Sequence, residues 1–394
     1  MAGLFKVRGG MKISLLTENL SVRGGTHKQV LRLAEYLRSC GDQVEIVTGE
    51  YQPDQCYEEF RDFVIKTDSR PRHGRLGRVA AAVRLARLIA PDCDVLNLHD
   101  QGCDLTARRA SLRRPSLPIV WQINDLHPAY RVGPCAGLKA HWLQPVHRSL
   151  GRWVARRCTV LTVNVTKNAR RVQENMGREA RVLYPGVDQD ASMPAVRALT
   201  VPLQVLSIGV LYHYRNYETV IESLAVLAKK GIRAELTIVG TTKFTPQYAR
   251  QLQALAEERG IAARFLGEVP GDVLRQTMAR SHVFVFVNLD QSWGLAAFEA
   301  LNMSLPVVLS ESVGAVELLR GNPSVRVVDP RSAAAVAAAI AEIASSQPHY
   351  ESLAGMAFES VRDYTWDKLY SSAMRRLFLE VSRPQRSLSA AAGR

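Results

Sequence analysis

Apolar residues recur along the chain with two alternating periods. Residues 11–17 form a short, mainly apolar run of the kind that makes a buried strand. The next apolar positions, from Val30 to Leu37, return every three to four residues, as in a helix. Residues 44–48 again predict a strand. A strand, a Gly24-Gly25 loop, a helix and a second strand in this order predict the start of a parallel, doubly wound sheet.

The same alternation continues through both halves of the chain. In the first half we expect further elements at residues 80–90, 95–98, 118–123, 138–157 and 160–164. Pro145 should kink or break the helix that contains it. In the second half we expect strands at 203–208, 234–239, 263–266, 282–287 and 306–309, and helices at 217–230, 246–259, 271–280 and 294–303. The pattern predicts two α/β domains, at residues 11–190 and 200–362, and a loose tail at 383–394.

Length and composition agree with two globular domains. The chain has 394 residues, of which 47% are hydrophobic and 22% charged. The net charge of +14 favours anionic partners. Arginines gather in the first half, at positions 70, 72, 75, 78, 84, 87, 108, 109, 113, 114, 148, 152, 156 and 157. Apolar residues lie among them, so an amphipathic surface facing an anionic membrane and simple solvated faces are both open. No nucleic-acid-binding pattern is present, so we expect no nucleic acid partner.

The chain carries no sign of export or of a membrane span. No run reaches the roughly 18 apolar residues that a span needs, and residues 1–10 lack a secretory apolar core. We therefore expect a cytoplasmic protein, with peripheral attachment to the inner face of the membrane left open. Six scattered cysteines suggest neither a zinc site nor a disulfide framework.

Two segments of the second half carry the most specific chemistry. Residues 291–301 come directly after an apolar strand and contain a glycine loop and the start of a helix. A strand, a glycine loop and a helix start in this order are typical of a phosphate- or sugar-binding corner. This segment resembles the donor-site signature of retaining glycosyltransferases of family 4, which has two glutamates separated by seven residues. Glu299 is the second of these, and Gln291 stands in place of the first. Residues 207–218 are similar to the family's Gly-Arg-Leu…Lys-Asn pattern: Gly209 and Asn216 match, Arg215 fills the lysine position, and Val210 replaces the arginine.

The resemblance implies a GT-B architecture, in which two Rossmann-like domains face a central cleft. A late tryptophan motif at Trp366 would start a helix, at about 366–382, that returns to the N-terminal domain. The family's roles then imply that Arg215 grips the donor diphosphate, that Glu299 holds the ribose, and that Gln291 bonds the transferred sugar without a charge. The catalytic candidates are Arg215, Gln291, Asp125 and Glu299. Further donor-binding candidates are Gly24, Gly25, Gly209, Asn216, Gly267, Glu268, Trp293, Gly294 and Leu295, and the acceptor candidates are His99, Asn124, Asp125 and His127.

The implied reaction is retaining transfer of a hexose-type sugar from a UDP- or GDP-linked donor. The acceptor would be a glycan or a lipid-linked intermediate in polysaccharide or glycoconjugate biosynthesis. We expect neither a metal nor a further cofactor. Two alternatives stay open because Asn124, Val210 and Gln291 each lose charge or basicity at a family position. One is a non-catalytic or weakly active sugar-nucleotide-binding protein, and the other is a sugar-nucleotide epimerase of the same fold.

Overall fold

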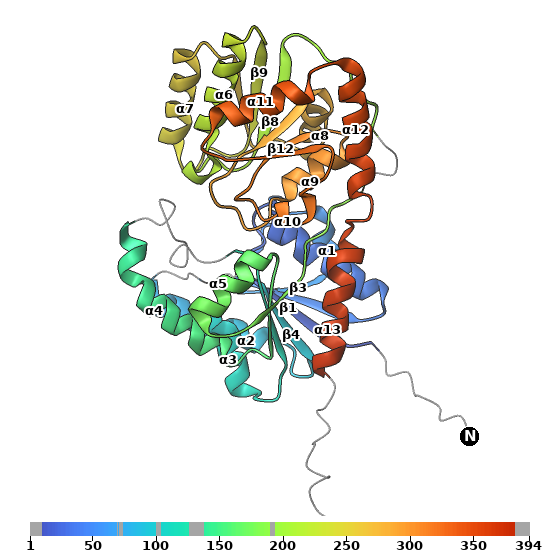
Figure 1. Ribbon diagram of the computed structural model, residues 1–394. Helices are drawn as coiled ribbons and strands as arrows, with labels where there is room; N and C mark the ends of the chain where they lie inside the picture. The colour runs from blue at the N-terminus through green and yellow to red at the C-terminus, as the bar shows by residue number, and fades with distance from the viewer. Residues whose placement is uncertain are drawn as a thin grey trace, which may run out of the picture. The chain divides into compact units, whose positions relative to one another are not determined.

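The computed structural model describes residues 10–68, 70, 74–99, 104–125, 138–189 and 194–382. The chain divides into two compact units (Figure 1). Unit 1 comprises Met1–Pro185 and Trp366–Arg394, and unit 2 comprises Gly186–Thr365.

Unit 1 is built on a seven-stranded parallel sheet. Its strand order is β3 (Val64–Thr67), β2 (Gln43–Thr48), β1 (Lys12–Thr17), β4 (Val95–His99), β5 (Ile119–Ile123), β6 (Val160–Val163) and β7 (Ala180–Val182). Its helices are α1 (Gly25–Ser39), η1 (Glu58–Asp62), α2 (Gly74–Leu88), α3 (Asp104–Arg113), α4 (Leu138–Ala155), α5 (Thr166–Met176), η4 (Asp367–Ser371) and α13 (Ser372–Ser382). Every residue of β4 and β5 is buried, as expected for central strands covered on both faces.

Unit 2 repeats the plan with six parallel strands. Their order is β10 (Ala263–Gly267), β9 (Ala234–Val239), β8 (Leu203–Ile208), β11 (Val283–Phe286), β12 (Val307–Ser310) and β13 (Val325–Val328). The helices are η3 (His213–Arg215), α6 (Tyr217–Lys229), α7 (Pro246–Glu258), α8 (Gly271–Arg280), α9 (Leu295–Asn302), α10 (Val316–Leu319), α11 (Ala333–Ile343) and α12 (Gln347–Val361). Figure 1 shows α6 and α7 on one side of this sheet and α9 and α12 on the other. The predicted class, α/β with two Rossmann-like domains, is confirmed.

The strand order of each sheet reverses at one point. In unit 1 the reversal lies between β1 and β4, and in unit 2 it lies between β8 and β11. Ligands of doubly wound sheets bind beyond the carboxyl ends of the strands at such a switch point. In unit 2, two loops leave the carboxyl ends of the strands at the switch point, one after Ile208 and one after Phe286. Both loops contain predicted site residues.

The C-terminal helix is tied to unit 1 by a buried carboxylate. The side chain of Asp42 is completely buried and accepts hydrogen bonds from the backbone N–H of Met11 at 2.9 Å and from Arg375 Nε at 2.7 Å. Arg375 lies on α13, so residues more than 300 positions apart in the chain share one ion pair. This ion pair holds the last helix against the first strand of the domain.

Of the two outcomes predicted for Pro145, a break of the helix is wrong, and a kink stays a prediction. Pro145 lies inside α4, and the helix runs through it from Leu138 to Ala155 without a break. A proline removes one backbone hydrogen bond and crowds the preceding turn. The remaining hydrogen bonds of an 18-residue helix are enough to carry it across that gap.

Candidate active site

Three glycines end neighbouring strands at the carboxyl edge of the unit 2 sheet. Gly209, Gly240 and Gly267 follow or end β8, β9 and β10, and their backbones are hydrogen-bonded in a row: Gly209 N–H to the Val239 carbonyl, and Gly240 N–H to the Gly267 carbonyl, each at 2.8 Å. A Cβ atom at position 240 would lie 1.9 Å from the Gly209 carbonyl oxygen. The backbones of Gly209 and Gly240 therefore approach more closely than a side chain at position 240 would permit.

Arg215 occupies the space beside Gly209. A Cβ atom at position 209 would lie 2.8 Å from Arg215 Cζ, so the guanidinium rests directly against the glycine. Cζ also lies 5.2 Å from the ring centre of Tyr214 and 5.5 Å from that of Phe286. Both distances are within the range of cation–π attraction. The cation is thus held by a glycine backbone and by two aromatic rings, one of them on β11.

Asn288, which the sequence patterns did not indicate, completes this cradle. With its amide oriented so that both ends are satisfied, its oxygen accepts from Arg215 Nη1 at 3.0 Å and its nitrogen donates to the Arg215 carbonyl at 3.2 Å. Within the described parts of the chain, no carboxylate forms an ion pair with Arg215. Among the described residues, no acidic side chain therefore offsets the charge of this guanidinium at the switch point of the sheet.

Asn216 has a structural place in this arrangement. Its backbone is left-handed, with φ of 59°, and it caps the start of α6. Its side-chain nitrogen donates to the carbonyls of Val287 at 3.1 Å and of Pro330 at 2.6 Å, while Thr219 Oγ1 donates to its oxygen at 2.9 Å. These bonds fix the loop that carries Arg215. A direct contact between Asn216 and the donor stays a prediction.

The Gln291–Gly294 loop is pinned to the segment after β12. The Gln291 carbonyl accepts from Gly314 N–H at 3.1 Å, and the Trp293 carbonyl accepts from Ala315 N–H at 2.8 Å. Trp293 is buried and stacks on Phe298, with ring centres 5.0 Å apart. The indole thus anchors the loop in the core and leaves its backbone at the sheet edge.

Gly294 turns this loop into helix α9. Its φ is 106°, and a Cβ atom there would lie 2.7 Å from Val313 Cγ1 and 3.1 Å from Phe286 Cε1. Phe286 therefore contacts Gly294 and also lies beneath the Arg215 guanidinium. No side chain caps α9, and its first turn has no acidic residue. The N–H groups of Leu295 and Ala296 are available to an anion, and Gly294 before them shares the aromatic neighbour Phe286 with Arg215.

The remaining donor candidates lie near this edge with different exposure. Glu299 is half-buried in the second turn of α9. Gly267 ends β10 with φ of 69°. Glu268 follows it, is exposed, and lies 3.9 Å from Lys243 Nζ.

In unit 1, the predicted glycine loop begins α1. Gly24 is its N-cap and Gly25 its first residue, with no capping side chain and no acidic residue in the first turn. A Cβ atom at position 24 would lie 3.1 Å from His27 Nδ1, so the ring of His27 lies close beneath the loop. The structure thus places an uncapped helix start at the β1–β4 switch point.

The acceptor candidates of unit 1 differ strongly in burial. His99 is completely buried, and its Nε2 lies 2.7 Å from Asn97 Oδ1. Burial, with a smaller effect of His27, lowers the pKa of His99 to about 3. Asn124 is half-buried and accepts from Gln122 Nε2 at 3.1 Å, whereas Asp125 is exposed. His127 lies outside the described residues, and acceptor contacts by these residues stay predictions.

Two family models together match residues 23–359. The first half of the chain, residues 23–191, matches the model described as Glycosyltransferase Family 4, and residues 188–359 match that described as Glycosyl transferases group 1. The chain belongs to glycosyltransferase family 4. It is 26% identical over 378 residues to the phosphatidyl-myo-inositol mannosyltransferase of Mycobacterium leprae, covering 93% of this chain and 96% of the relative.

Further comparisons with this family 4 glycosyltransferase agree in sequence and in fold. It is 28% identical over 255 residues to the GDP-mannose-dependent alpha-(1-6)-phosphatidylinositol monomannoside mannosyltransferase of Mycobacterium tuberculosis, covering 59% of this chain and 65% of the relative. Among solved structures, HepE from Anabaena in complex with UDP and glucose superposes with a TM-score of 0.72 at 16% identity, over 93% of this chain and 99% of HepE. The fold of this family 4 glycosyltransferase is GT-B, as predicted.

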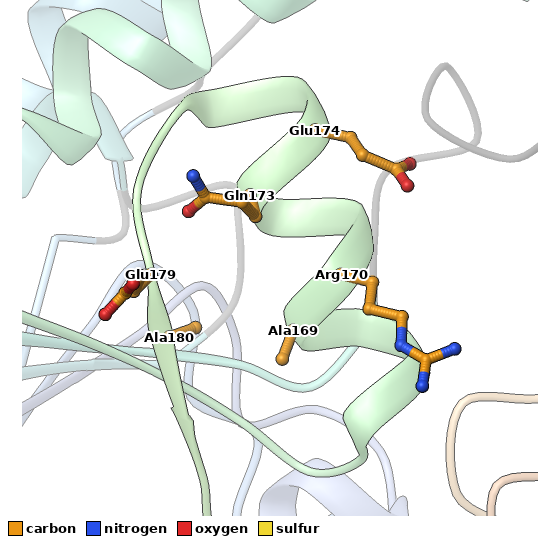
Figure 2. Close-up of a pocket in the computed structure, with 6 residues that line it drawn as sticks. All are labelled: Ala169, Arg170, Gln173, Glu174, Glu179 and Ala180. Atoms are coloured by element: carbon orange, nitrogen blue, oxygen red, sulfur yellow. The ribbon is translucent and has the colours of Figure 1, made fainter.

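A hollow on unit 1 is lined by none of the predicted site residues (Figure 2). It has a volume of about 500 Å³ and lies between helix α5 and strand β7. It is lined by Ala169, Arg170, Gln173, Glu174, Glu179 and Ala180. Its charged lining residues are of both signs, so it does not select a cation or an anion.

In the described parts of the enzyme, no helix is long and apolar enough to cross a bilayer.

Proposed function

We propose that this enzyme transfers a hexose, with retention of configuration, from a nucleoside-diphosphate sugar to a glycan or lipid-linked acceptor. The observation that carries the proposal is Arg215, a fixed cation without a carboxylate partner among the described residues. Negative charge grows on the leaving diphosphate as its bond to the sugar breaks. A preorganised cation at that place stabilises the transition state more than the ground state.

Helix α9 supplies the second positive group. Its uncapped N-terminus adds the partial positive charge of the helix dipole. Phe286 packs against both Gly294, at the start of this helix, and the Arg215 guanidinium, so the two positive groups lie beside the same ring. Leu295 N–H and Arg215 would bind the diphosphate oxygens, and Glu299 would accept hydrogen bonds from the ribose. Gln291 would bond the sugar hydroxyls through a neutral amide.

Retention follows when the acceptor hydroxyl attacks the anomeric carbon from the face that the diphosphate leaves. The acceptor oxygen forms the new bond as the carbon–oxygen bond to phosphate breaks, and the acceptor proton passes to a phosphate oxygen of the leaving group. Both electrons of the broken bond stay on the diphosphate. This step needs no protein nucleophile and no further cofactor, so the residues mainly orient the reactants and stabilise charge.

The first donor to test is GDP-mannose, and the first acceptor is a phosphatidylinositol-type lipid. This choice rests on the mannosyltransferases that the chain resembles. UDP-linked donors remain candidates because the structurally similar HepE binds UDP and glucose.

The purified protein should be incubated with each GDP- and UDP-linked sugar, with and without lipid acceptor, and the products analysed by mass spectrometry and proton NMR. We expect a glycoside that keeps the anomeric configuration of the donor. An inverted product would contradict retention. An altered free sugar formed without acceptor would indicate an epimerase, and donor binding without turnover would indicate a binding protein.

We also propose that helices α3 and α4 of unit 1 form a surface that meets anionic lipid. Three apolar side chains are exposed there: Leu112 at 51%, Val146 at 63% and Trp153 at 42%. The Arg108 guanidinium lies 4.3 Å from the ring centre of Trp153. Exposed arginines surround them, at positions 113, 148, 152, 156 and 157. Apolar side chains among cations suit the interface of a negatively charged bilayer, where the acceptor would reside.

Vesicle co-sedimentation tests this surface. Binding should rise with the fraction of anionic phospholipid and fall with salt, because the attraction is screened. Leu112→Ser should weaken binding several-fold, while Val64→Ser, which changes an exposed apolar residue of β3, should not. Equal binding to neutral and anionic vesicles would contradict the proposal.

A further inference from the structure

Asn288 stands at the point where the two halves of the unit 2 sheet meet. It follows β11 by two residues and is 2% exposed. Its carbonyl accepts from Ser310 Oγ at 2.8 Å, and the next residue, Leu289, donates its N–H to the Tyr214 carbonyl at 2.8 Å. The backbone of Asn288 is therefore fixed by β12 on one side and by the Arg215 loop on the other.

The amide of Asn288 grips Arg215 at two places. Its oxygen accepts from Nη1 and its nitrogen donates to the backbone carbonyl of the same arginine, at 3.0 and 3.2 Å. The side chain and the backbone of Arg215 are thus clamped to one buried, rigid group. Because the clamp is neutral, it orients the guanidinium without reducing its charge. A carboxylate in the same place would hold the arginine more tightly but would compete with an anionic ligand.

Gln291 reaches the same amide. Its Oε1 lies 3.3 Å from the Asn288 side-chain atom that faces Arg215 Nη1. When that atom is the oxygen, as the two bonds to Arg215 require, the Gln291 amide can turn its nitrogen toward it and donate. A glutamate cannot donate once ionised. A glutamate at position 291 would place its carboxylate against the Asn288 oxygen, and the two oxygens would repel each other. Otherwise the Asn288 amide would rotate by half a turn, which would break both of its hydrogen bonds to Arg215.

We infer that Asn288 and Gln291 are paired positioning residues that hold Arg215 as an uncompensated cation for the diphosphate. The glutamine at position 291 is then matched to Asn288 and is not a damaged glutamate. This inference rests on the proposed function, because it assumes that the anion bound at Arg215 is the diphosphate of the donor.

Calorimetric titration of the full chain with GDP, UDP and inorganic pyrophosphate tests the inference. We expect Arg215→Ala to weaken the best of these ligands at least tenfold, and Asn288→Ala to weaken it about three- to tenfold. Gln291→Glu and Asn288→Asp should each weaken it by a similar factor, because each places a carboxylate near the guanidinium. Asn288→Asp also keeps the side-chain volume, so it covers the case in which the alanine variant does not fold.

A double-mutant cycle separates positioning from a general effect on the fold. In the Arg215→Ala background, Asn288→Ala should cause no further loss of affinity. An equal loss in both backgrounds would overturn the inference. Wild-type affinity in Asn288→Ala, or tighter binding in Gln291→Glu, would also overturn the inference. Neither result would contradict a diphosphate site at Arg215. If Arg215→Ala itself binds all three ligands as the wild type does, the proposed function fails at its diphosphate site.

Discussion

The backbone of Gly209 lies directly against the guanidinium of Arg215. A Cβ atom at position 209 would lie 2.8 Å from Cζ and 2.9 Å from Nε. These atoms belong to the far end of a flexible side chain, so a larger residue at 209 would displace Arg215 and leave the sheet in place. The glycine therefore sets the position of the cation on which the proposed chemistry depends.

Gly209→Ala should lower the rate of sugar transfer at least tenfold, because the guanidinium can no longer rest at the sheet edge. The φ of 152° adds backbone strain of about 1–2 kcal/mol. Gly231→Ala is the matched control, since it has φ of 80° and open space around the added Cβ. It should lose comparable stability and keep its transfer rate. Equal rates in the two variants would show that contact with Arg215 does not matter.

Arg375→Ala should destabilise unit 1 by about 3 kcal/mol, because it leaves the completely buried carboxylate of Asp42 without its charge partner. Hydrogen exchange of peptides from α13 and β1 would report the loss directly. Arg376→Ala, which changes an exposed neighbour on the same helix, should change stability by less than about 0.5 kcal/mol. Similar exchange rates in both variants would contradict the role of the buried pair.

The stability of unit 1 should depend on the titration of His99. Its pKa in the folded state is lowered to about 3, below the usual value of 6.5. Its contribution is therefore complete above pH 6.5 and is lost as the pH falls toward 3, by about 1.4 kcal/mol for each unit.

Urea denaturation of the wild type and of His99→Gln, at pH 7 and pH 5, checks this sign. The glutamine can keep a hydrogen bond to Asn97 and does not titrate, so the variant should lose about 2 kcal/mol less between the two pH values. Asp104, whose pKa burial raises to about 6, acts in the opposite direction in both proteins and cancels in the comparison. Identical losses would show that His99 does not bind protons on unfolding.

Much of the fold can be predicted from the sequence, because central parallel strands are continuous apolar runs. Residues 283–286 are such a run, and residues 203–208 are mainly apolar. Helix α5 was not predicted because its sequence is mostly polar, with Val172 and Met176 among its few buried apolar residues. The strands β3, β7 and β13 at the sheet edges have only three or four residues, too few for a clear pattern.

The site is predictable only where one segment contains the whole pattern. Gln291, Gly294 and Glu299 lie in one stretch, and the family resemblance finds them. Asn288 was missed because its role depends on two loops, after β8 and after β11, that meet only when the strand order reverses. No local spacing can show that an asparagine 73 positions after Arg215 holds its guanidinium.

The most direct test of the account is the rate of sugar transfer at saturating donor, measured for the wild type, Arg215→Ala and Arg250→Ala. Arg250 is an exposed arginine of α7 and serves as the charge-matched control. We predict that Arg215→Ala lowers kcat at least about a hundredfold, because the cation meets the charge that develops in the transition state, and that Arg250→Ala keeps it. An unchanged kcat in Arg215→Ala would contradict the account.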